Sequence, residues 1–157
     1  MSLLSTGLAA GIGLAVVRHK KIYEAAAPYR AMINEAAGSA GVSPCVLAAL
    51  LWQESNFSSD IVGSSGEYGM SQITPAALED INMSKSDIEG DARAQINAGA
   101  KFLALQIKRV GDVYNGLRAY NAGAAGSARD MTIGSSYAIQ VLITALTDYL
   151  YGVLHHA

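Results

Sequence analysis

The clearest helix signal in this chain is the stretch Ser43-Pro-Cys-Val-Leu-Ala-Ala-Leu-Leu-Trp-Gln-Glu54. Serine is favoured immediately before a helix and proline in its first turn, so the helix is predicted to begin at Pro44. Leu47, Leu51 and Glu54 fall at positions i, i+4 and i+7, which lie on one face. The stretch therefore predicts an amphipathic helix whose apolar face ends in a carboxyl group.

The rest of the chain carries similar signals. Alanine-rich and apolar segments with a helical period are separated by glycine, and several begin at a capping Ser, Thr or Asp. Helices are predicted over 22–37 with a break at Pro28, 44–54, a short segment that Thr74-Pro75 begins, 92–109 after the cap Asp91, 113–120 and about 135–154. Loops are predicted over 38–41, 58–68 and in the Gly/Ala/Ser-rich stretch after Gly123. Since the sequence has no alternating strand pattern and no repeat, the expected fold is one all-α domain.

The composition limits the classes of function. The chain has 157 residues, of which 51% are hydrophobic and 15% charged, with a formal net charge of -2. This balance is typical of a folded domain and offers no basic face for a nucleic acid. The single cysteine, Cys45, is predicted to be a small buried thiol with no histidine nearby in the sequence. We therefore expect no disulfide, no metal site and no cofactor.

Glu54 has the setting of an acid that keeps its proton. It shares a face with buried leucines, and it lies in the last turn of its helix, where the helix dipole disfavours negative charge. Both effects raise the pKa of a carboxyl group. A carboxyl that is protonated near neutral pH can give its proton to the leaving oxygen of a glycosidic bond. The helix taken alone favours the other interpretation, an ordinary glutamate turned to solvent at a helix end.

Three motifs in order decide between these interpretations. Leu51-Trp-Gln-Glu-Ser-Asn-Phe57 is followed by Gly66-Glu-Tyr-Gly-Met-Ser-Gln-Ile-Thr-Pro75 and then by Ala119-Tyr-Asn-Ala-Gly123. Over about residues 42–145 the chain resembles the soluble lytic transglycosylases (SLT), relatives of goose-type lysozyme. Ala98-Gly-Ala-Lys-Phe-Leu103 is similar to that family's Ala-Gly-x-x-Tyr-Leu helix. The resemblance implies a lysozyme-like helical domain that cleaves the glycan strands of peptidoglycan.

The resemblance also implies roles for single residues. Glu54 would be the only catalytic acid and base. The substrate-binding residues would be Ser55, Met70, Gln72, Tyr120, Asn121 and Tyr137.

Within this set the implied roles differ. Ser55 would be a hydrogen-bonding neighbour of Glu54, Gln72 would bind an N-acetyl sugar, and the hydroxyl of Tyr137 would lie close to the catalytic carboxyl. Met70 could instead be core filler, and Tyr120 could be structural.

The chain departs from the family pattern at several positions. Ser71 replaces a usual methionine, which predicts a more polar cleft floor, and Gly63-Ser64-Ser65 replaces Ser-Pro-Ala, which predicts a looser loop. Ala124-Ala125 replaces a proline, and Gln95 stands where asparagine is common. None of these changes removes a group that transfers a proton, so the implied reaction type is unaffected.

Three functions remain open at this point. Common glycoside hydrolases need two carboxylates, whereas the resemblance gives a catalytic role to Glu54 alone. This favours a transglycosylase that closes a 1,6-anhydro ring on N-acetylmuramic acid. Glu67 or Asp60 could instead position a water, as in a hydrolytic goose-type muramidase. The chain could also be a virion or secretion-apparatus component that only binds the glycan. Nothing in the sequence fixes the oligomeric state.

The N-terminus is a separate segment, residues 1–21, ahead of the domain over 22–157. Residues 3–17 are apolar and rich in Gly and Ala, and a basic cluster follows at 18–21. The run is shorter than the roughly 20 apolar residues of a membrane span, and it lacks the features of a cleavable signal peptide. It is either a packed or peripheral helix or a membrane-associated anchor. Peptidoglycan as substrate implies action in the periplasm or cell wall, and the uncleaved segment fits a phage particle, a conjugation-type apparatus or membrane association.

Overall fold

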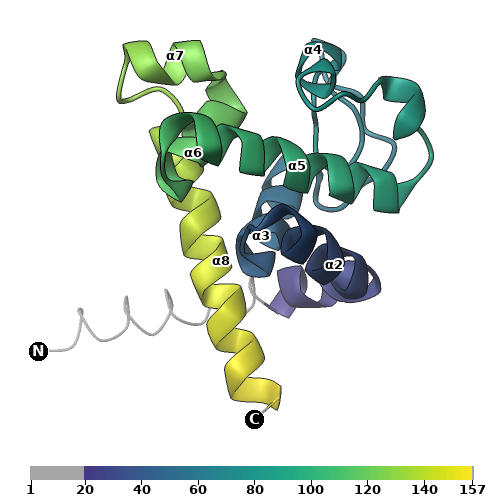
Figure 1. The fold of residues 1–157 in the computed structure, drawn as a ribbon. Helices are drawn as coiled ribbons and strands as arrows, with labels where there is room; N and C mark the ends of the chain where they lie inside the picture. The colour runs from purple at the N-terminus through teal and green to yellow at the C-terminus, as the bar shows by residue number, and fades with distance from the viewer. Residues whose placement is uncertain (1–19, 157) are drawn as a thin grey trace, which may run out of the picture.

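The computed structural model describes residues 20–156, and over that range it consists of helices and irregular loops, with no strand beyond isolated bridges (Figure 1). The all-α prediction is confirmed. The elements are η1 (Ala27–Tyr29), α2 (Arg30–Ala40), α3 (Pro44–Ser55), α4 (Pro75–Glu79), η2 (Lys85–Asp87), α5 (Ala92–Val110), α6 (Val113–Ala122), α7 (Ala124–Arg129) and α8 (Ser135–His156). The predicted apolar segment at 3–17 lies outside the described residues.

Local chemistry sets most helix ends where the sequence predicts them. Residues 20–26 are helical, and η1, which contains Pro28, interrupts the helix before α2 because proline lacks the N–H that a helix interior needs. The side chains of Thr74 and Asp91 cap α4 and α5 by accepting hydrogen bonds from backbone N–H groups. At the other end of α5, Gly111 takes a left-handed conformation that stops the helix.

Two of the predicted loops are wrong. α2 continues through residues 38–40 and ends only at Gly41, whose φ of 70° lies in the left-handed region that glycine adopts easily. The Gly/Ala/Ser-rich stretch after Gly123 forms the short helix α7. The carbonyls of Ser127 and Asp130 accept hydrogen bonds from the buried guanidinium of Arg118, a contact that links α7 and the turn after it to α6.

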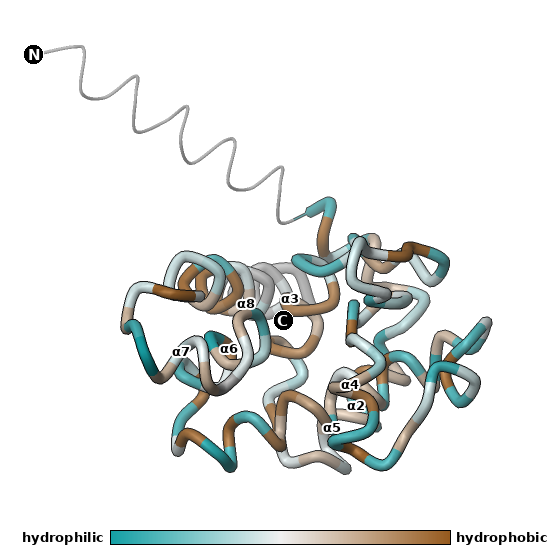
Figure 2. Tube along the Cα trace, turned by 90° about the horizontal axis from the view of Figure 1, so that it is seen from above, coloured by the Kyte–Doolittle hydropathy of each residue, from teal (hydrophilic) through white to brown (hydrophobic). Residues whose placement is uncertain are grey.

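α3 lies at the centre of the packing. It contacts α2, α5 and α8, and α5 in turn packs against α2 and α6. Leu47, Leu50 and Leu51 are completely buried, and Ala48 and Ala49, which lie off the predicted apolar face, are buried too. α3 is therefore enclosed on several sides instead of being amphipathic. Apolar and polar residues alternate along the more exposed helices, as the view from above shows (Figure 2).

The long loop between α3 and α4 is fastened to α5 by one buried side chain. Gln95 Oε1 accepts a hydrogen bond from the backbone N–H of Met70 at 2.9 Å. Its Nε2 donates to the carbonyls of Ser59 and Ile88, each at 3.1 Å. Two isolated bridges centred on Tyr68 close the loop on itself. Gln95 thus holds this loop at Met70 and Ser59 and joins it to the chain at Ile88, just before α5.

α8 presents an apolar stripe to the surface. Its members follow at i, i+4, i+7 and i+10 and are about half exposed: Ile139, Ile143, Leu146 and Tyr149. Cys45, predicted to be buried, is partly exposed in a groove of about 270 Å³ beside this stripe.

Within residues 20–156 no single helix has both the length and the apolar character to cross a bilayer. The helical segments 20–40 and Pro44–Ser55 reach that length and apolar character only when they are counted together, and a bend of 117° separates them.

Candidate active site

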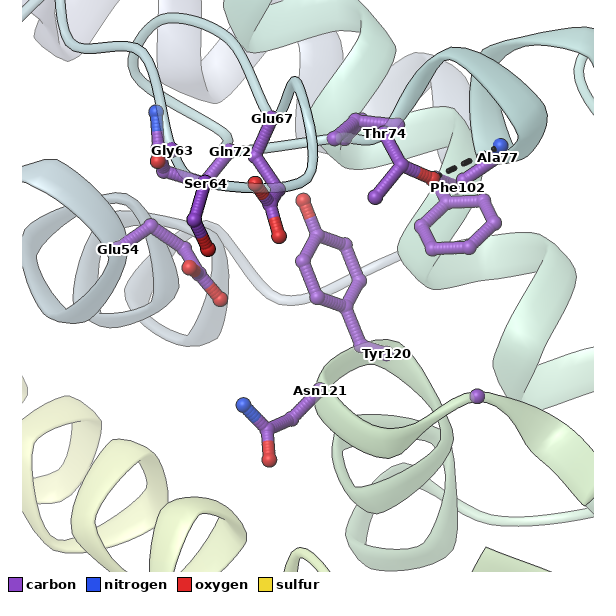
Figure 3. Close-up of a pocket in the computed structure, with 12 residues that line it drawn as sticks. Glu54, Gly63, Ser64, Glu67, Gln72, Thr74, Ala77, Phe102, Tyr120 and Asn121 are labelled. Atoms are coloured by element: carbon purple, nitrogen blue, oxygen red, sulfur yellow. Dashed lines mark hydrogen bonds between the residues drawn. The ribbon is translucent and has the colours of Figure 1, made fainter. Parts of the chain in front are cut away.

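A cleft of about 450 Å³ opens at the C-terminal end of α3. The end of α3, the loop after it, α4, α5 and the end of α6 all contribute to its walls. The lining residues are Glu54, Gly63, Ser64, Glu67, Gln72, Ile73, Thr74, Ala77, Phe102, Tyr120, Asn121 and Gly123 (Figure 3). Segments from distant parts of the sequence therefore meet around Glu54.

Glu54 lies in the last turn of α3 and is partly buried. Burial raises the pKa of its carboxyl group, a hydrogen bond from Tyr137 lowers it, and the negative charge of Glu67 raises it, so that the pKa moves from 4.5 to about 7. A carboxyl group with a pKa near 7 can give a proton and take one back at neutral pH.

Tyr137 reaches Glu54 from α8. Its hydroxyl donates a hydrogen bond to Glu54 Oε1, so the structure brings together the two groups that the resemblance paired. Burial and the charge of Glu54 raise the pKa of the phenol well above its ordinary value, so it stays a neutral donor. One turn along α8, Gln140 accepts a hydrogen bond from Gln53 at 3.2 Å, which joins the same two helices.

Tyr120 and Asn121, at the end of α6, lie across the cleft from Glu54 (Figure 3). The Tyr120 hydroxyl donates to the carbonyl of Ser71 at 2.7 Å, and its ring packs edge-to-face on Phe102 with centroids 5.1 Å apart. The hydroxyl therefore serves the fold, and the ring is the part of Tyr120 that borders the cleft. Asn121 is exposed beside it.

Gln72 also lines the cleft, from a strained position in the loop. Its φ of 44° is left-handed, which is uncommon for a residue with a side chain. Its Nε2 donates to the carbonyls of Ile61 at 3.1 Å and Gly69 at 2.8 Å. These bonds tie the amide nitrogen to the loop and fix how the side chain faces the cleft.

Ser55 and Met70 lie away from the cleft, which differs from the prediction that they contact the substrate. Ser55 is 4% exposed, and its hydroxyl bonds to the carbonyls of Leu51 at 3.2 Å and Met70 at 2.9 Å instead of to Glu54. Consecutive residues on a helix are rotated by about 100°, so Ser55 faces the core when Glu54 faces the cleft. The Met70 side chain is completely buried, which agrees with the alternative of core filler.

Ser71 does not form a polar cleft floor either. It is completely buried, and its Cβ would lie only 3.0 Å from a side-chain carbon placed on Gly99. The serine therefore allows the loop to approach α5 closely, and the expectation of a more polar floor is wrong.

The loop at residues 63–65 is tight, where the sequence predicted a looser one. The backbone N–H of Gly63 donates to the carbonyl of Glu67 at 2.8 Å, and that of Gly66 donates to Gly63 at 3.2 Å. The Glu67 carboxylate folds back over this turn, where the N–H of Ser65 donates to its Oε2 at 2.8 Å. A side chain at Gly63 would overlap the Glu67 carboxylate, which would then have to leave this position.

Of the two acidic residues predicted to border the cleft, only Glu67 lines it. Asp60 is exposed and accepts a hydrogen bond from the neighbouring Ser59 hydroxyl at 3.2 Å. The Glu67 carboxyl accepts hydrogen bonds from the backbone N–H groups of Glu67 itself and of Ser65, and these bonds lower its pKa. Within residues 20–156 no three His, Cys, Asp or Glu side chains lie close enough together to hold a metal ion.

Arg118 is a residue of the site's framework that the sequence did not single out. It is 2% exposed, and it donates to the carbonyls of Ser127, Asp130 and Ile133 at 2.8, 2.7 and 3.1 Å. These bonds fix the chain that follows α6 and Asn121. An arginine between two apolar residues in Leu117-Arg-Ala119 is the only sequence signal for this role.

Comparison with known proteins agrees with this arrangement. The family model described as "Transglycosylase SLT domain" matches residues 31–142. Among solved structures, an inactive mutant of the lytic transglycosylase Slt from Pseudomonas aeruginosa superimposes with a TM-score of 0.62 at 20% identity. The match covers 82% of this chain and 24% of that one, so this chain spans about a quarter of that protein's length. At this identity the likeness shows a shared fold.

Proposed function

Since the chain belongs to the transglycosylase SLT domain family, we propose that it is a peptidoglycan lytic transglycosylase with Glu54 as catalytic acid and base. The observation that carries the proposal is the setting of this carboxyl group, which lies in the cleft, is largely shielded from water and has a pKa of about 7. Its substrate puts its action in the periplasm or cell wall.

In the first step Glu54 acts as an acid. Its proton passes to the oxygen that bridges N-acetylmuramic acid and N-acetylglucosamine, and the bond between that oxygen and C1 of the muramic sugar breaks. The N-acetylglucosamine leaves with a free hydroxyl, and C1 becomes cationic. Glu54 is left as a carboxylate, which the hydrogen bond from Tyr137 stabilises.

In the second step Glu54 acts as a base. It removes the proton of the C6 hydroxyl of the same muramic sugar, and the C6 oxygen forms a bond to C1. This closes the 1,6-anhydro ring, returns the proton to Glu54 and consumes no water. One carboxyl group is sufficient for both steps because its pKa of about 7 suits giving and taking a proton.

The walls of the cleft provide the sugar contacts. The ring of Tyr120 offers a flat apolar surface, and Asn121 beside it offers hydrogen bonds. Gln72 lines the same cleft, and because its amide nitrogen is bonded to the loop, its amide oxygen would accept the N–H of an N-acetyl group. Ser55 and Met70 act indirectly by holding the loop on α3.

Hydrolysis is the second candidate, because Glu67 lies in the cleft with Glu54. If Glu67 positioned a water opposite Glu54, the product would be the hydrated sugar of a goose-type muramidase. The mass of the released ends distinguishes the two reactions.

We also propose that residues 3–17 contact a membrane. A Cβ on Gly152 of α8 would lie 3.8 Å from the ring of Tyr23, so the chain enters the domain beside the C-terminal half of α8. The stripe from Ile139 to Tyr149 is on that helix and adds apolar surface. In a phage particle or a conjugation-type apparatus, residues 3–17 would attach the protein to the membrane and the domain over 22–157 would cleave the glycan. Liposome flotation with and without residues 1–21 tests the proposal, and equal binding would contradict it.

Removal of the Glu54 carboxyl tests the central assignment. Wild-type protein and Glu54→Gln are each added to purified peptidoglycan, and loss of turbidity is followed. The expected loss of rate is at least about a hundredfold, the usual size of an acid–base contribution. Glu89→Gln, an exposed change outside the cleft, is the control and should clear at the wild-type rate. A Glu54→Gln protein that clears normally would contradict catalysis by this residue.

A further inference from the structure

The cleft is acidic. Of its twelve lining residues, Glu54 and Glu67 carry carboxyl groups, and none is lysine, arginine or histidine. Figure 3 shows both carboxyl groups pointing into the same space. No ion pair in the described part of the chain involves Glu67. A negative charge that no cation neutralises thus borders the space where the glycosidic bond would lie.

The Glu67 carboxylate is held in place by backbone groups. The N–H of Ser65 donates to its Oε2 at 2.8 Å, and the turn from Gly63 to Glu67 is closed by a backbone hydrogen bond of the same length. Gly63 leaves room for the carboxylate, which would have to shift if residue 63 carried a side chain. A charge fixed in this way needs no reorganisation when the charge of the substrate changes.

We propose that Glu67 is a second functional carboxylate of this cleft, a fixed negative charge that keeps Glu54 protonated and stabilises the sugar cation formed when the glycosidic bond breaks. The proposal rests on the function proposed above. Glu67 makes no bond to the sugar and transfers no proton, so the two steps described for Glu54 are unchanged.

The chemistry of the two carboxyl groups supports different roles for them. Backbone hydrogen bonds lower the pKa of Glu67, whereas burial raises that of Glu54 to about 7. Two acids whose pKa values are pushed apart in one cleft can have one member protonated and the other ionised at neutral pH. A carboxylate that binds protons weakly is a poor base towards water, but it remains a full negative charge.

The other groups that face Glu54 do not provide this charge. Tyr137, from α8, donates to Glu54 and is neutral, and Tyr120, from α6, is buried with a pKa well above its ordinary value. Glu67, from the loop, is the anion whose charge raises the pKa of Glu54. Removing that anion should therefore lower the pKa at which Glu54 loses its proton.

The experiment compares wild type with Glu67→Gln, which keeps an oxygen for the Ser65 N–H, and with Glu67→Asp, which keeps the charge. Soluble glycan strands are the substrate, and kcat, KM, the pH profile of kcat/KM and the product masses are measured. We expect Glu67→Gln to lose about tenfold or more in kcat with little change in KM. The basic limb of its profile should move to lower pH, and Glu67→Asp should recover part of both effects. Melting temperatures of all three proteins show whether each is folded.

The outcomes separate this proposal from the previous one. An unchanged kcat and an unmoved basic limb in Glu67→Gln would overturn the role of Glu67 and leave that of Glu54 intact. Hydrated ends from wild type that become anhydro ends in Glu67→Gln would mean that Glu67 positions a water, which also overturns the fixed-charge role. If both wild type and Glu67→Gln released only hydrated ends, this result would contradict the transglycosylase function itself.

Discussion

The hydroxyl of Tyr137, on α8, donates a hydrogen bond to Oε1 of Glu54, at the end of α3. Burial favours the protonated form of this carboxyl and the hydrogen bond favours its ionised form, and together with the charge of Glu67 they give a pKa of about 7. Packing of α3 against α8 therefore adjusts the proton affinity of the group on which the proposed chemistry depends.

Tyr137→Phe removes the hydrogen bond and leaves the ring. Because the bond lowers the pKa of Glu54, its loss should raise that pKa above about 7. The basic limb of the kcat/KM profile should move to higher pH, opposite to the shift expected for Glu67→Gln, and kcat should fall about tenfold as the carboxylate loses a donor. The pH profile of glycan cleavage measures this shift. A basic limb that stays in place would show that the hydrogen bond does not set the proton affinity of Glu54.

Glu54 should also make stability depend on pH. Its pKa is 4.5 in the unfolded chain and about 7 in the fold, so the unfolded state loses the proton first as pH rises. The stabilisation that protonated Glu54 contributes is fully present below about pH 4.5 and is lost as pH rises through about pH 7. The free energy of unfolding falls by roughly 3 kcal/mol in total. Glu54→Gln lacks this penalty, so it should be about as stable as wild type at acidic pH and more stable above pH ~8. Urea unfolding at both pH values tests this, with Glu89→Gln as control. A difference that does not change with pH would contradict it.

Gln95→Leu should loosen the loop that carries Gln72. The change leaves the backbone N–H of Met70 and the carbonyls of Ser59 and Ile88 without their partners, at a cost of about 3 kcal/mol or more in unfolding free energy. Urea denaturation measures the loss. Gln140→Leu removes an exposed side chain with a single side-chain bond and should change stability by less than about 0.5 kcal/mol. Equal effects of the two changes would mean that Gln95 does not anchor the loop.

Arg118→Met should release the chain after α6. Three backbone carbonyls lose a charged donor, and we expect a loss of about 3 kcal/mol or more in stability. Limited proteolysis should cut between residues 123 and 134 faster than in wild type. Arg129→Met, at the exposed end of α7, is the matched control and should be cut at the wild-type rate. Unchanged cutting of Arg118→Met would contradict the anchoring role.

Local signals in the sequence predicted much of the fold. Pro28, Thr74, Asp91 and Gly111 each act on the backbone beside them, so their effects could be expected without tertiary information. α7 was missed because part of its support comes from Arg118, which contacts residues nine and twelve positions further on. Such contacts become visible only when the helices are packed.

The candidate site was predicted in part. The order of three motifs indicated Glu54, Gln72 and Asn121, and the structure places all three at one cleft. Ser55 was included as a neighbour of Glu54 in sequence, although the helical rotation turns it into the core. The choice between Glu67 and Asp60 stayed open, because the turn that aims Glu67 at the cleft depends on backbone hydrogen bonds within the loop.

The mass of the glycan ends released from purified peptidoglycan tests the proposed reaction most directly. A reaction in which Glu54 gives a proton to the bridging oxygen and then takes one from the C6 hydroxyl consumes no water. Wild-type protein should therefore release muramic ends in the 1,6-anhydro form, lighter by one water than hydrolysed ends. Ends that carry the added water would contradict the transglycosylase mechanism.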